Sequence, residues 1–93
     1  MSSWTERAKA VLPGGGFGNF DASLVIERGQ GSRVWDADGN EYLDYLIGSG
    51  PMLLGHSHPE VVDAVAEQLS EGFSFFASNP KGIELAEVIC EAV

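Results

Sequence analysis

The stretch "LVIERGQGSRVWDADGNEYLDY", Leu24 to Tyr45, decides the fold class of this 93-residue chain. Short runs rich in β-branched and aromatic residues alternate in it with polar turns, which is the pattern of strands that follow one another along the chain. The turns are "GQG" and "ADGN", and in the second one Asp38-Gly39 supplies a residue that accepts a positive φ. We therefore expect a three-stranded antiparallel meander over residues 24–45.

Residues 1–12 carry the pattern of a short helix that precedes the meander. Ser3 and Glu6 have the spacing of a capping box, in which each side chain satisfies an amide of the first turn. Pro13 ends the pattern, because proline interrupts a helix. We expect a loop over residues 13–23, whose glycines permit backbone angles that other residues avoid.

Two more helices are predicted after the meander. A glycine-rich turn over residues 46–58 leads to a helix over residues 59–71, which Pro59 can start because a proline in the first turn loses no hydrogen bond. Asn79, followed by proline, gives a similar start signal for a helix that begins within residues 79–93. Apolar residues recur on one face of each helix, and we expect both faces to be buried: Val61, Val62, Val65 and Leu69, then Ile83, Ala86, Ile89, Cys90 and Val93. The fold class is thus α/β, with a helix, a meander and two helices.

The composition limits both the core and the partners. A chain of this length can bury only one modest core, while the hydrophobic fraction of 44% is that of a folded protein. The net charge of -9 repels phosphate backbones and anionic lipid, which argues against nucleic acid and membranes as partners. The apolar runs are too short for a membrane span or a signal peptide, so a cytoplasmic location is the default expectation.

Two features of the C-terminal helix bear on its surroundings. Cys90 is the single cysteine, which excludes an internal disulfide, and its apolar neighbours predict a buried thiol. The helical pattern reaches Val93 without a glycine, asparagine or proline to end it. We therefore expect the chain to be a fragment of a longer protein.

The two histidines of "GHSHPE" allow a metal-binding and a structural interpretation. His56 and His58 would share a face on an extended backbone and could chelate a metal, but no third ligand is obvious nearby. A histidine just before a helix-starting proline can instead hydrogen-bond the open end of the helix, and we favour this role. Ser57 is an improbable nucleophile, because adjacent side chains on an extended chain point apart.

Two other motifs resemble ligand-binding loops only superficially. "DADGNE" lacks the spacing of a calcium loop, since the sixth and twelfth positions counted from Asp36 hold Glu41 and Ile47 instead of glycine and glutamate. A hairpin turn explains these residues. "GGGFG" has neither the lysine of a P-loop after it nor a strand before it, so it is either a flexible loop or a loop shaped to meet a ligand closely.

The aromatic loop and the lysines complete the candidate groups. Phe73, Phe75 and Phe76 are expected to form a hydrophobic corner with at least two of the rings packed, although they could also wall a pocket. Lys9 and Lys81 lie beside helix starts or on exposed faces. Neither position promises the burial that a Schiff-base lysine needs.

Four stretches together resemble the N-terminal portion of the pyridoxal-phosphate-dependent class III aminotransferases, especially the branch similar to glutamate-1-semialdehyde aminomutase. They are "LPGG" at 12–15, "GSRVWDADGNEYLDY" at 31–45, "GPMLLGHSHPEVVDAV" at 50–65 and "SFFASNPKGIELAEVI" at 74–89. Each is modest alone, but their order and spacing are specific. The resemblance implies an N-terminal segment of a fold-type-I transferase, with the large cofactor domain absent from these residues, and a homodimer as the full-length state.

The resemblance also implies the chemistry. A transaminase of this family moves an amino group between a small-molecule amine or amino acid and a carbonyl acceptor, with pyridoxal 5'-phosphate as the cofactor. The family's cofactor-binding lysine and its phosphate contacts lie downstream of Val93, so the 93-residue chain alone is expected to be inactive. Its expected contribution is part of the substrate pocket, from Phe17, Gly18, Asn19, Phe20, Ser49 and Gly50. An aminomutase, a non-catalytic truncated chain that acts by interaction, and an unrelated ligand-binding domain remain as alternatives.

Two positions depart from the aminomutase-like pattern. Such relatives usually carry an arginine in the loop after "PGG" that grips a substrate carboxylate, and no arginine lies between Pro13 and Glu27. They also often place tryptophan just before "GP", where Ser49 stands. With Phe17 and Phe20 in place of a cationic grip, we expect a substrate with an apolar group on this side. The meander and helices are expected to bury their apolar faces against segments that these residues do not include.

Overall fold

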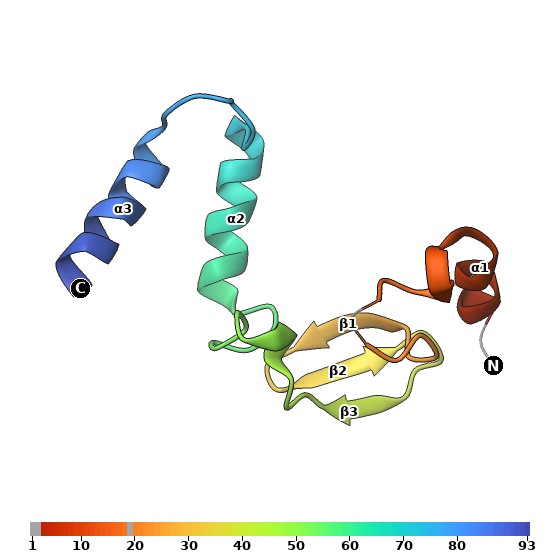
Figure 1. Cartoon of the computed structure of the whole chain (residues 1–93). Helices are drawn as coiled ribbons and strands as arrows, with labels where there is room; N and C mark the ends of the chain where they lie inside the picture. The colour runs from red at the N-terminus through yellow and green to blue at the C-terminus, as the bar shows by residue number, and fades with distance from the viewer. Residues whose placement is uncertain (1–2, 19) are drawn as a thin grey trace. The chain divides into compact units, whose positions relative to one another are not determined.

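The computed structural model describes residues 3–18 and 20–93, and the chain divides into two compact units, Met1–Pro59 and Glu60–Val93. The predicted fold class is confirmed, since a helix, a three-stranded antiparallel sheet and two helices follow one another along the chain (Figure 1). The elements are α1 (Ser3–Val11), η1 (Pro13–Gly15), β1 (Ile26–Gln30), β2 (Arg33–Asp36), β3 (Glu41–Leu43), η2 (Ile47–Ser49), α2 (Pro59–Glu71) and α3 (Pro80–Ala92).

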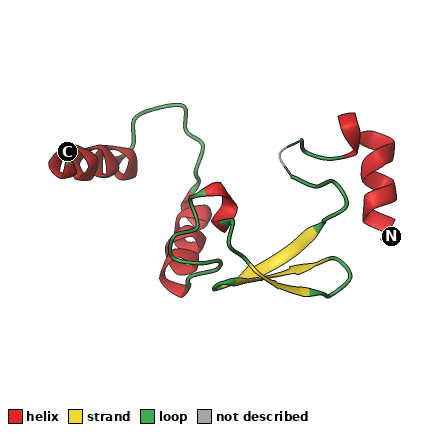
Figure 2. Ribbon diagram, turned by 60° about the horizontal axis from the view of Figure 1, so that its bottom comes forward, coloured by secondary structure: helices red, strands yellow, loops and turns green. Residues whose placement is uncertain are grey.

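The sheet of the first unit has the strand order β1-β2-β3, with both pairs antiparallel (Figure 1). Figure 2 shows these strands in yellow. Gln30 pairs with Arg33 at the first turn, and Trp35 pairs with Glu41 near the second. The register shifts once within β1, between Ile26 and Arg28. This meander is short, so side chains and neighbouring loops must hold its ends.

The turn between β2 and β3 is built around the carboxylate of Asp36. Its oxygens accept hydrogen bonds from the amides of Asp38 and Asn40, from the Asn40 side chain and from the Tyr42 hydroxyl, at 2.8–3.0 Å. Gly39 has a φ of +89°, as the Asp38-Gly39 pair predicted. The Asn40 side-chain bond is the main cause that lowers the pKa of Asp36, and the Asp36 bond raises the pKa of the Tyr42 hydroxyl. The Asp36 carboxylate thus holds the turn together, which fits the hairpin interpretation of "DADGNE".

The second unit carries α2 and α3. The Asn79 side chain accepts a hydrogen bond of 2.9 Å from the amide of Gly82, and Pro80 occupies the first turn of α3. This is the cap that the Asn-Pro pair predicted, because asparagine satisfies one of the open amides at the start of a helix. Over the described residues, no helix is both long and apolar enough to cross a bilayer.

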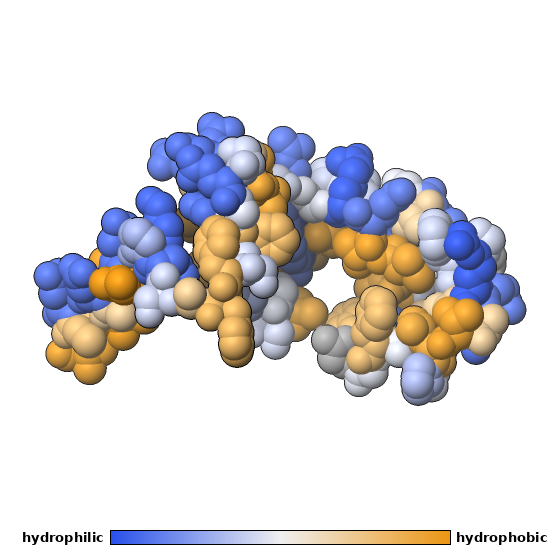
Figure 3. All heavy atoms as spheres, turned by 90° about the horizontal axis from the view of Figure 1, so that it is seen from above, coloured by the Kyte–Doolittle hydropathy of each residue, from blue (hydrophilic) through white to orange (hydrophobic). Residues whose placement is uncertain are grey.

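The described residues form no buried apolar core of their own. Among them only Thr5 and Asp36 are buried, and no apolar side chain is. The predicted apolar stripes of α2 and α3 are about half exposed or more, and Cys90 is exposed as well. The reason is that a periodic pattern defines a face, but burial needs a second surface to cover it. Apolar side chains consequently make up much of the molecular surface in Figure 3.

The aromatic loop between α2 and α3 differs from expectation in the same way. Phe73, Phe75 and Phe76 are 75%, 52% and 109% exposed, so the hydrophobic corner does not form within the described chain. Phe76 also has a φ of +52°, which is uncommon for a bulky residue.

Candidate functional site

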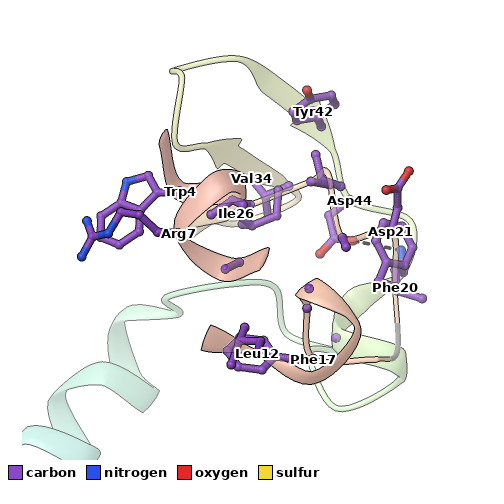
Figure 4. A pocket seen from close by; sticks show the side chains of 18 of the residues that line it. Trp4, Arg7, Leu12, Phe17, Phe20, Asp21, Ile26, Val34, Tyr42 and Asp44 are labelled. Carbon is purple, nitrogen blue, oxygen red and sulfur yellow. Dashed lines mark hydrogen bonds between the residues drawn. The ribbon is translucent and has the colours of Figure 1, made fainter. Parts of the chain in front are cut away.

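The first unit contains a cleft of about 1060 Å³ between α1, the loop that follows it and the sheet. Figure 4 shows the side chains that border it, contributed by all of these elements. Most of the lining is apolar, with Trp4, Leu12, Ile26 and Val34 among the lining residues. The cleft can therefore take an apolar group of a ligand or of another protein segment.

The structure places the predicted pocket residues in two groups. Phe17 and Phe20 line the cleft and are 90% and 61% exposed. Gly18 lies between them with a φ of +87° but is not among the lining residues, and the predicted residue Asn19 lies outside the described part of the chain.

The second group is the turn at η2. Ser49 and Gly50 are exposed and do not line the cleft, whereas their neighbour Gly48 does. The backbone of this turn is unusual, since Ile47 and Ser49 have φ values of +50° and +66°. Of the turn at η2, Gly48 is therefore the one residue that borders the cleft lined by the loop after α1.

A carboxylate that the sequence did not single out holds this turn. Asp44 Oδ1 accepts hydrogen bonds from the amides of Leu46 and Ile47, at 2.9 and 3.1 Å. Asp44 Oδ2 lies 2.5 Å from His56 Nε2, whose N–H donates to it. The histidine bond, followed by the Ile47 amide, lowers the pKa of the Asp44 carboxyl. Both side chains are largely covered, 12% and 23% exposed, and both line the cleft.

His56 thus has a structural role, but not the one expected of it. The imidazoles are predicted to cap the helix that Pro59 starts, but the His56 Nε2 points instead to Asp44, just after β3. The backbone of His56 exchanges two hydrogen bonds with Gly31, at 2.8 and 2.9 Å, and its ring covers Gly29 so closely that a Cβ there would lie 2.7 Å from the ring carbon Cγ. The described residues include no cluster of histidine, cysteine or acidic groups suited to a metal.

The cleft has one guanidinium among its described lining residues. Arg7 of α1 lies over the ring of Trp4, 4.2 Å from its centroid, which is a cation–π arrangement. Arg7 precedes "PGG", so the absence of an arginine from the loop after that motif did not predict it. The helical spacing of Trp4 and Arg7 on one face was the signal that could have found it.

The described residues do not fit the covalent anchor of pyridoxal phosphate. The Lys9 and Lys81 side chains are 54% and 77% exposed, and each lies within 4.0 Å of a glutamate on its own helix. Neither lines the cleft. A Schiff-base lysine needs a buried position, and both of these side chains are more than half exposed.

Comparison with known proteins shows that the chain is part of an aminotransferase. It matches the family model for class III aminotransferases over residues 18–92, and it belongs to this family. It is 46% identical over 96 residues to a glutamate-1-semialdehyde 2,1-aminomutase from Syntrophomonas wolfei, a match that covers 94% of this chain and 22% of the relative. The chain therefore spans about a fifth of the length of the curated relatives it matches.

Solved structures agree with this assignment. An omega-transaminase from Sphaerobacter thermophilus has a TM-score of 0.86 and 36% identity, over 95% of this chain and 21% of that one. A transaminase with PLP bound has a TM-score of 0.78 and 36% identity, over 90% and 21%. A β-phenylalanine aminotransferase from Variovorax paradoxus has a TM-score of 0.78 and 34% identity, over 94% and 21%.

Proposed function

We propose that the complete polypeptide carrying these residues is a pyridoxal-phosphate-dependent transaminase, and that this segment forms part of its substrate pocket. The family match over residues 18–92 is the observation that carries the proposal. When bound, the cofactor supplies the electron sink that lets an amino group move between donor and acceptor. Since the lysines described here do not fit its covalent anchor, this segment binds and orients the substrate rather than activating it.

In this proposal, the loop after α1 and the turn at η2 face the substrate. The loop contributes Phe17, Gly18, Asn19 and Phe20, and the turn contributes Ser49 and Gly50. We propose an amine or amino acid with an apolar group as the substrate. Two observations support this class: Phe17 and Phe20 border an apolar cleft, and one of the similar structures is named a β-phenylalanine aminotransferase.

A donor series tests the proposal in the complete polypeptide. Purified protein should retain pyridoxal phosphate, measured by mass and visible absorbance, and should prefer an aromatic β-amino acid or arylalkylamine over glutamate. Phe17→Ala should raise KM for the aromatic donor roughly 2- to 10-fold, the loss expected for one aromatic contact, while Phe73→Ala, outside the cleft lining, is the matched control. Turnover of dicarboxylic or semialdehyde substrates alone would refute the substrate class.

A glutamate-1-semialdehyde aminomutase is the second candidate. The identity of 46% to such an enzyme favours it, as does Arg7, a guanidinium that lines the cleft and could bind a carboxylate. If this candidate is right, Arg7→Ala should raise KM for the semialdehyde and leave an arylalkylamine unaffected. If the transaminase proposal is right, the complete polypeptide should not isomerise the semialdehyde.

We also propose that the complete enzyme is a cytoplasmic homodimer acting on small molecules. The family resemblance supports the dimer, and the net charge of -9 argues against binding to nucleic acid or anionic lipid. Sedimentation of the purified polypeptide and fractionation of the source cells would test the two statements separately.

A further inference from the structure

The turn Ile47–Gly50 holds two of its residues, Ile47 and Ser49, in a backbone conformation that they do not favour. Ile47 and Ser49 both have positive φ, and for a β-branched residue such as isoleucine this is a genuine outlier. Conformations of this kind persist only where neighbouring groups over-determine them.

Asp44 is the first of these groups. Its Oδ1 accepts hydrogen bonds from the amides of two successive residues, Leu46 and Ile47. The carboxylate therefore fixes the direction in which the chain leaves β3. The amides of Ser49 and Gly50 then bond the carbonyls of Leu46 and Ile47, at 2.9 and 3.1 Å. The position of the whole turn therefore depends on where the Asp44 carboxylate lies.

His56 is the second group, and it fixes Asp44. Its Nε2–H donates to Asp44 Oδ2 from a ring that cannot move freely, because Gly29 packs against one side and the backbone is paired with Gly31. The Ser57 hydroxyl adds a hydrogen bond of 2.9 Å to the carbonyl of Gly29. A continuous set of contacts thus joins β1, His56, Asp44 and the turn.

We propose that Asp44 and His56 are positioning residues that set the place of Ser49 in the substrate pocket of the enzyme. This inference rests on the proposed function, in which the turn faces the substrate. Both side chains border the cleft, but the proposal gives them neither a contact with the substrate nor a proton-transfer step. The pair acts through the turn, so its loss should weaken productive binding of the donor more than it slows the reaction of donor that is correctly bound.

Two variants of the complete polypeptide separate positioning from mere bulk. His56→Leu keeps an apolar side chain over Gly29 but removes the donor, whereas His56→Gln keeps an N–H at a similar reach. A hydrogen bond to a carboxylate is strong enough that we expect His56→Leu to raise KM for the amino donor at least about tenfold, with a smaller change in kcat. His56→Gln should restore KM to within roughly threefold of the wild type.

A second measurement does not depend on activity. Amide exchange over residues 46–50 should quicken roughly tenfold in His56→Leu and stay near the wild-type rate in His56→Gln. Equal KM values, or equal exchange rates in the two variants, would overturn the inference. A wild-type polypeptide that neither binds pyridoxal phosphate nor transaminates would instead refute the proposed function, and with it the role of the turn in the substrate pocket. The amide-exchange rates would still decide whether Asp44 and His56 hold the turn.

Discussion

Gly29 is the position where a single methyl group should do most to disturb the site. Its φ is not positive, so alanine meets no conformational penalty there, but the added Cβ would lie 2.7 Å from His56 Cγ and 2.9 Å from His56 Cβ. Both distances are well below van der Waals contact, so the histidine must move away. Overpacking of this kind costs about 1–3 kcal/mol, and the displaced ring also loses its alignment with Asp44.

The cost should appear as local opening rather than global unfolding. Gly31 and His56 exchange backbone hydrogen bonds across the contact, so their amides report it directly. A cost of about 1–3 kcal/mol accelerates their exchange roughly 5- to 150-fold in the complete polypeptide carrying Gly29→Ala. In a His56→Gly background, which removes both clashing carbons, the same substitution should cost less than about 0.5 kcal/mol. Equal costs in the two backgrounds, or no change in exchange, would refute the steric reasoning.

Three further predictions concern the pH dependence, a helix cap and the isolated segment. The hydrogen bond from His56 lowers the pKa of the Asp44 carboxyl. The carboxylate's stabilisation of the turn is therefore fully present above the ordinary carboxyl pKa and is lost as the pH falls below it, through the lowered pKa. Amide exchange over residues 46–50, corrected for its intrinsic pH dependence, should rise on acidification in the wild type and not in Asp44→Asn. Asn79→Ala should lower the helicity of a peptide spanning 77–93 by the equivalent of about 1 kcal/mol, measured by circular dichroism, and Asn79→Asp should retain it. The 93-residue chain by itself should show no cooperative thermal transition, since it buries no apolar side chain among its described residues; a sharp transition with strong near-ultraviolet dichroism would contradict this.

Local signals in the sequence predicted the local structure well. Asp38-Gly39 and Asn79-Pro80 each affect only the neighbouring few residues. The first pair places a positive φ at Gly39, and in the second the Asn79 side chain caps the Gly82 amide. Such effects depend only on the backbone geometry that adjacent residues favour. The order of helix, meander and two helices followed from them together with periodicity.

Contacts across the chain were harder to predict. Asp44 and His56 are separated by twelve positions and meet only because the chain returns past β1 after η2. The sequence favoured a structural role for His56 over a metal site, but it gave no sign that Asp44 would accept its hydrogen bond. The prediction of buried helix faces failed for a related reason. The spacing of apolar residues in α2 and α3 defines a face but says nothing about the surface that covers it.

The exposure of Cys90 gives the segment a natural reporter. It is the single thiol of the chain and lies on the apolar stripe of α3. A maleimide should modify it readily in the isolated 93-residue chain. If α3 packs against other parts of the complete polypeptide, the rate of labelling at Cys90 will measure how completely that stripe is covered, without the introduction of any probe residue.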